Sequence, residues 1–173
     1  MNKAPILVLA VGNPSRGDDA FGPMLADQLL SWLDSQAEDV QACVELIADQ
    51  QLMVEHVMDL SEREQILFVD AAMQSDDAVS LTRLEALPTE QAAQAVNSHS
   101  CTPTQLLGLY QAMLLQRPPP AQLLSLRGHR FELGEPLSPQ ARAHLPQAVA
   151  LMHQWLNDAL NKVAPTITGR DHA

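Results

Sequence analysis

Short apolar runs alternate with segments of helical spacing along this chain. The run at residues 6–11 is rich in β-forming residues and stops at Gly12, which is typical of a buried strand. Residues 78–84 alternate between apolar and polar, as an edge strand does. In all, the pattern predicts five strands, over residues 6–11, 40–48, 65–69, 78–84 and 123–126.

Helical spacing fills most of the sequence between these strands. Residues 20–33 repeat apolar side chains at the helical period, and Thr102, Pro103 and Gln105 form a helix start with a capping box. Ser138 begins a further helical turn, and Pro146 is expected to restart that helix. The predicted helices cover residues 20–33, 52–60 and 102–115, together with the segment from Ser138 to about residue 160.

This alternation predicts an α/β fold, a single three-layer domain with a twisted, mostly parallel sheet of about five strands and helices on both faces. The domain is expected to span residues 1–165, followed by a flexible tail at 166–173. Ligands of such folds bind beyond the carboxyl ends of the strands. The segments after Val11 and Val69, and the loop before Thr102, map to that edge.

Composition narrows the classes of ligand. The formal net charge is −11, which disfavours nucleic acid and anionic membranes but accepts a metal ion or a basic peptide. The two cysteines, Cys43 and Cys101, indicate no disulfide framework, and Cys43 is expected to lie inertly within a strand. No secretory signal or membrane-spanning run is recognisable, so we expect a cytoplasmic protein without membrane insertion.

The loop after the first predicted strand carries two adjacent carboxylates, Asp18 and Asp19, where a helix begins. It matches neither a dinucleotide-binding loop nor a P-loop, and its own negative charge occupies the place where a phosphate would bind. An aspartate there commonly caps the helix. One carboxylate suffices for a cap, which leaves the other to bind a cation or a proton.

Asp70 and His99 are the other chemically capable residues at the expected edge. Asp70 closes an apolar strand, where it serves either as a turn residue or as a ligand or catalytic group. His99 is either a solvated loop residue or a metal ligand and proton carrier. Two carboxylates and an imidazole suit a divalent first-row metal, but their separation in the sequence matches no local metal motif.

Other candidates are weaker on residue type. Cys101 with His99 as base would be a nucleophilic pair, although no third group is evident to orient it. His129 is expected in a surface loop, and Glu55 on an exposed helix face. Familiar zinc and serine protease signatures are absent from the sequence.

Taken together, these segments resemble the hydrogenase maturation protease family. The opening loop, with Gly12 and Asn13 followed by residues 17–22, resembles the family's first signature. It departs from it in two places, since the family often has a hydrophobic residue where Ser15 or Arg16 stands and a glycine where Ala20 stands. The remaining matches are Gln51, Leu52 and Glu55, the strand segment 68–72, Ser98 and His99 with residues 102–107, and the closing segments 128–132 and 134–138.

The resemblance implies an endopeptidase that removes the C-terminal extension of a nickel-iron hydrogenase large-subunit precursor after nickel insertion. Carried over position by position, it implies that Asp19, Asp70 and His99 contact nickel, which the precursor would supply. It also implies that the protein is a monomer when free and pairs with the precursor. The alternatives are a non-catalytic chaperone that senses nickel, and a small-molecule hydrolase whose pocket would present convergent neutral polar groups.

Overall fold

A five-stranded sheet forms the centre of the protein. The computed structural model describes residues 3–73, 75–93 and 101–168, with the backbone alone for 164–168. The strands, in chain order, are β1 (Ile6–Val11), β2 (Val44–Asp49), β3 (Gln65–Ala72), β4 (Val79–Arg83) and β5 (Ala121–Arg127). Their order in the sheet is β2-β1-β3-β5-β4, and β4 alone runs antiparallel to its neighbour. The predicted α/β class and mostly parallel sheet are confirmed.

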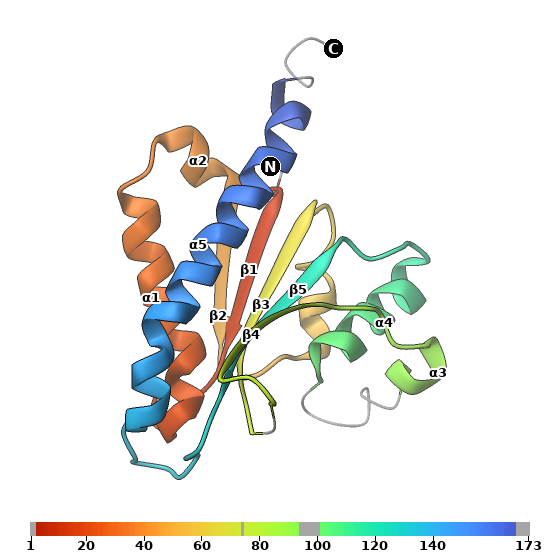
Figure 1. The fold of residues 1–173 in the computed structure, drawn as a ribbon. Helices are drawn as coiled ribbons and strands as arrows, with labels where there is room; N and C mark the ends of the chain where they lie inside the picture. Colours follow the sequence, from red (N-terminus) through yellow and green to blue (C-terminus); the bar gives the residue numbers. More distant parts are fainter. Residues whose placement is uncertain (1–2, 74, 94–100, 169–173) are drawn as a thin grey trace.

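Helices cover both faces of this sheet (Figure 1). One face is covered by α1 (Phe21–Asp34) and α5 (Pro139–Thr168), and the other by α3 (Thr89–Ala92), α4 (Pro103–Leu114) and the 3₁₀ turn η2 (Val54–Val57). Because side chains alternate along a strand, β1 contributes to both layers. Ile6, Val8 and Ala10 pack in the α1 and α5 layer, whereas Leu7, Leu9 and Val11 pack against α4 and η2.

The start of α4 is the local prediction that the structure reproduces most closely. Thr102 is the N-cap, its hydroxyl accepts from the Gln105 N–H, and the Gln105 side chain accepts from the Thr102 N–H. Pro103 occupies the first helical position, where its missing N–H costs nothing.

Several predicted boundaries are wrong. Residues 40–43 belong to helix α2 (Glu38–Cys43) and not to a strand, so Cys43 ends a helix. The predicted helix over 52–60 is reduced to η2 and turns, since the Nδ1 of His56 accepts the Met53 N–H that opens this segment. Strand β3 continues past Val69 to Ala72 because its last residues pair with β5.

Helix α5 is continuous through Pro146. The proline removes one hydrogen bond, but Ala141, Ala148, Met152 and Leu156 pack into the core at helical spacing on either side of it. Packing therefore outweighs the local interruption. The helix extends to Thr168, three positions beyond residue 165, and residues 169–173 lie outside the described part of the chain.

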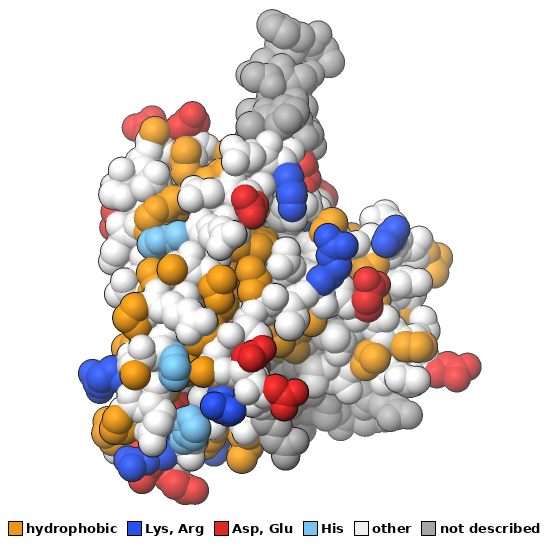
Figure 2. Space-filling view, in the orientation of Figure 1, with side chains coloured by type: hydrophobic (Ala, Val, Ile, Leu, Met, Phe, Trp, Pro, Cys, Tyr) orange, Lys and Arg blue, Asp and Glu red, His pale blue; other side chains and the backbone are white. Residues whose placement is uncertain are grey.

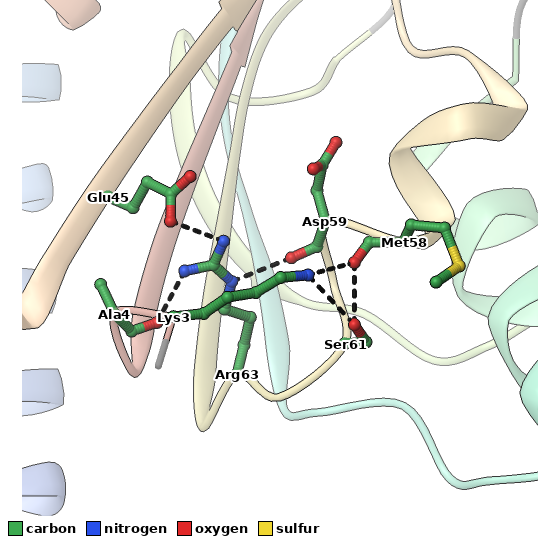
Figure 3. Close-up of polar contacts among 7 residues, drawn as sticks. All are labelled: Lys3, Ala4, Glu45, Met58, Asp59, Ser61 and Arg63. Carbon is green, nitrogen blue, oxygen red and sulfur yellow. Dashed lines mark hydrogen bonds and ion pairs between the residues drawn. The ribbon is translucent and has the colours of Figure 1, made fainter. Parts of the chain in front are cut away.

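The amino ends of the strands are tied together by polar contacts (Figure 3). Arg63, which is buried, donates to the carbonyl oxygens of Ala4 and Asp59 and forms an ion pair with Glu45, with Nη2 2.7 Å from Oε2. These bonds join the start of β1, the side of β2 and the turn before β3 at the end opposite the carboxyl edge.

Within the described residues, no helix is long and apolar enough to span a membrane.

Candidate functional site

The carboxyl end of β1 meets the start of α1 at unusually short range. A Cβ at Gly22 would lie 1.9 Å from the carbonyl oxygen of Val11, so only glycine permits this approach. Gly12 has φ +145°, and a Cβ there would lie 1.9 Å from the carbonyl oxygen of Asp19. These two glycines therefore allow the loop that carries Asp18 and Asp19 to pack directly against the strand ends.

Asp18 is fully buried and joins this loop to a distant segment of the chain. Its carboxylate accepts from the backbone N–H groups of His129, Arg130 and Ser138, at 2.7, 3.2 and 2.6 Å, and from the Ser138 hydroxyl at 2.8 Å. Burial raises the pKa of Asp18, but these hydrogen bonds outweigh it, so the pKa lies below its ordinary value. Asp18 therefore caps no helix of its own. It fixes the segment 129–138, whose last residue in turn caps α5.

The side chain of Asp19 lies in a different environment from that of Asp18. Its Oδ2 accepts from the Asn13 N–H at 2.9 Å, and the residue lines an open cleft of about 420 Å³. Asp70 lines the same cleft from β3, on the sheet face that Ile66 and Phe68 share with the α4 layer. Two sequence-predicted residues are thus brought together at the carboxyl edge of β1 and β3, from positions 51 residues apart.

The environment of Asp70 disfavours its charge. Burial raises its pKa, a hydrogen bond from the Ala71 N–H lowers it, and the negative charge of Asp19 raises it again, to about 7. A neighbouring cation would reverse this balance by stabilising both carboxylates. The two side chains are therefore suited to hold a metal ion, and Asp70 alone can carry a proton near neutral pH.

Apart from Cys101, the rest of the cleft is lined by residues to which the sequence analysis assigned no chemical role. Arg16 and Phe131 line it, as do Gln50 and Gln51, which follow the end of β2. Their place in the sequence was the available signal: Arg16 lies in the loop after the first predicted strand, Gln50 lies shortly after the second, and Gln51 and Phe131 lie in family-like segments. The lining residues other than the two carboxylates are Val11, Arg16, Gln50, Gln51, Leu52, Ala71, Met73, Cys101 and Phe131.

Charged side chains of both signs are spread over the face of the molecule that Figure 2 shows, from its upper edge to its lower end, and apolar side chains are frequent between them.

Cys101 lines the cleft but is poorly suited to act as a nucleophile. Burial raises the pKa of its thiol, and the negative charge of Glu55 raises it further, to about 11. At neutral pH the thiol is therefore protonated, and the thiolate is the reactive form. Glu55 is exposed in η2, and His129 is an exposed loop residue, as the sequence predicted for both side chains.

His99 lies outside the described residues, so its predicted contact with nickel stays a prediction. Among the described residues, no group of three or more His, Cys, Asp or Glu side chains is placed to hold a metal ion. Asp19 and Asp70 are the two members of the predicted set that the structure locates.

No protein-family model matches this sequence, and no curated protein matches it. Solved structures do match along most of the chain. The hydrogenase maturating endopeptidase HybD from E. coli is similar with a TM-score of 0.61 and 21% identity, over 88% of this chain and 92% of that one. The [NiFe] hydrogenase maturation protease HycI from Thermococcus kodakarensis KOD1 has the same TM-score and identity, over 90% and 94%.

A hydrogenase 2 maturation peptidase from a Thaumarchaeota archaeon is similar with a TM-score of 0.58 and 23% identity, over 87% of this chain and 97% of that one. At these identities the likeness establishes the fold. The protein therefore has the α/β fold seen in hydrogenase maturation endopeptidases, along nearly its whole length.

Proposed function

We propose that this protein is an endopeptidase that removes the C-terminal extension of a nickel-iron hydrogenase large-subunit precursor once nickel is inserted. The observation that carries the proposal is the pairing of Asp19 and Asp70 in an open cleft at the carboxyl edge. Solved structures of this fold that match the chain are described as hydrogenase maturation endopeptidases. A protein segment can bind in an open cleft, whereas a sealed pocket would exclude it.

The donor set fits nickel carried by the precursor. Asp19 and Asp70 would supply carboxylate oxygens, and a cation between them would offset both the burial and the repulsion from Asp19 that raise the pKa of Asp70. We propose His99 as the third contact. Cys101 lines the cleft two positions after it in the sequence. Nickel would polarise the scissile carbonyl or mark the loaded precursor for recognition.

The chain's own residues would place the segment that is cut. Hydrolysis adds water across one peptide bond, giving a carboxylate on the mature subunit and an amine on the released tail. With no cation in the cleft Asp70 titrates near pH 7, so it would release its proton readily at that pH when nickel approaches and then contact the ion as a carboxylate. Asn13 holds Asp19 through its N–H, so the orientation of that carboxylate is fixed before substrate binds.

The test is processing of a purified, nickel-loaded precursor, followed by intact-mass spectrometry. We expect a mass loss equal to the C-terminal tail with the wild type, and none with Asp19→Asn or His99→Ala. Binding of the precursor without any mass loss would instead identify a nickel-sensing chaperone. Circular dichroism of each variant checks that the fold is retained.

A further inference from the structure

Arg16 is the one cationic side chain among the described residues that line the cleft. It stands in the same cleft as the carboxylates of Asp19 and Asp70, yet no ion pair joins it to either of them within the described chain. A cation that lines the same cleft as two carboxylates without forming an ion pair with either is available for an anion that enters from outside.

The guanidinium is held in place from the side that faces the protein. Its Nε donates to the carbonyl oxygen of Phe131 at 3.2 Å, and within the described residues its two terminal nitrogens have no hydrogen-bond partner. An arginine whose stem is already ordered loses less conformational entropy when its fork binds a carboxylate. The fork geometry suits a carboxylate better than any neutral group.

Both ends of this contact belong to rigid segments. The N–H of Gly17 donates to Glu135, and the N–H of Gly134 donates to Ser15, at 3.0 and 2.7 Å. Asp18 fixes the same two segments to each other through its buried hydrogen bonds. These bonds fix the backbone at Arg16, and the bond from its Nε to the carbonyl oxygen of Phe131 orients the exposed side chain.

We propose that Arg16 binds a carboxylate of the protein segment that occupies the cleft, and so helps to determine which precursors are processed. This inference rests on the proposed endopeptidase function and adds the chemistry of its substrate. The protein as a whole is strongly acidic and repels anions, so one ordered cation at the cleft fixes where an acidic group is accepted. Met73, 74% exposed, and Phe131 line the same cleft and offer it apolar contact.

The experiment compares three variants in steady-state processing of the nickel-loaded precursor. Arg16→Gln removes the charge, and Arg16→Lys keeps the charge without the fork. Arg130→Gln is the matched control, because Arg130 is an exposed arginine on the facing segment that does not line the cleft. We expect Arg16→Gln to raise KM by about tenfold with kcat within about twofold, Arg16→Lys to lie between, and Arg130→Gln to match the wild type.

The substrate side of the experiment identifies the carboxylate. One precursor has every Asp and Glu of its tail changed to Asn or Gln, and a second has its C-terminal carboxylate amidated. The substrate that lacks the recognised carboxylate should show the raised KM with the wild type, and Arg16→Gln should add nothing to it. This non-additivity tells a side-chain carboxylate from the terminal one.

Two results would overturn the inference while leaving the proposed function intact. One is processing by the wild type with an unchanged KM in Arg16→Gln. The other is a loss confined to kcat, which would assign Arg16 to the transition state and not to recognition. An absence of processing by the wild type would instead refute the proposed function itself. Melting temperatures of the Arg16 variants equal to that of the wild type exclude misfolding as the cause.

Discussion

Replacing Asp70 with Asn should stabilise the folded protein at neutral pH and remove its activity. In the folded state the pKa of Asp70 is raised from 3.8 to about 7, mainly by burial and further by the charge of Asp19. Folding therefore favours the protonated form. An amide has the same shape and carries no charge, so Asn resembles the form of the side chain that the site prefers.

The size of the effect follows from the shift in pKa. About three units at 1.36 kcal/mol each set an upper limit of about 4 kcal/mol. Below pH 4 the group is protonated in both the folded and the unfolded state, so wild type and Asp70→Asn should have similar stability. Between about pH 4 and pH 7 the unfolded state releases its proton first, so the wild type loses stability as pH rises. Above pH 7 the difference should stay constant.

Urea unfolding at pH values from 4 to 8 measures this difference directly. The control is Asp27→Asn, which neutralises an exposed carboxylate on α1 and should shift stability little at any pH. Asp19→Asn should reduce the pH dependence of the wild type, since it removes the charge that raises the pKa of Asp70. A stability difference that is flat from pH 4 to pH 8 would refute the account of Asp70.

Three further substitutions test other parts of the site. Asp18→Asn should lower the free energy of unfolding at pH 7 by about 3 kcal/mol, and the loss should shrink as the pH falls below about 4, because the unfolded wild-type chain then binds a proton that the folded Asp18 carboxylate still lacks; denaturant titration measures both. Gly22→Ala should cost about 1–3 kcal/mol, seen as a lower melting temperature, because its Cβ would overlap the Val11 carbonyl. Cys101→Ser should keep precursor processing, since the wild-type thiol is protonated near pH 7.

Elements with strong local signals were predictable from the sequence. Strand β1 and helix α4 match because an apolar run ending at Gly12 and a full capping box at Thr102 favour the structures that packing also requires. The paired acids were predictable in part, because the carboxyl ends of parallel strands share one edge. The sequence placed Asp70 after its strand, whereas pairing with Ser125 keeps it inside β3.

Features decided by distant contacts were not predictable. The apolar run around Val40 fits a strand or a helix equally well, and helix α2 forms there before β2 begins. The role of Asp18 depends on backbone N–H groups more than 100 positions away, which no local pattern reveals. The hydrogen bond from Arg16 to the carbonyl oxygen of Phe131 likewise forms only because the fold brings these two distant residues together.

Asp18 and Asp19 have different roles because their side chains lie in different environments. The Asp18 carboxylate is buried and accepts four hydrogen bonds from the segment 129–138, so it is not available to a ligand. Asp19 turns toward the cleft, where its charge raises the pKa of Asp70. If Asp18 turned toward the cleft, the buried N–H groups of the segment 129–138 would lose their acceptor. If Asp19 turned inward, its buried charge would lack hydrogen bonds. Loss of Asp18 should therefore act on the cleft indirectly, by releasing the segment that carries Phe131 and positions Arg16.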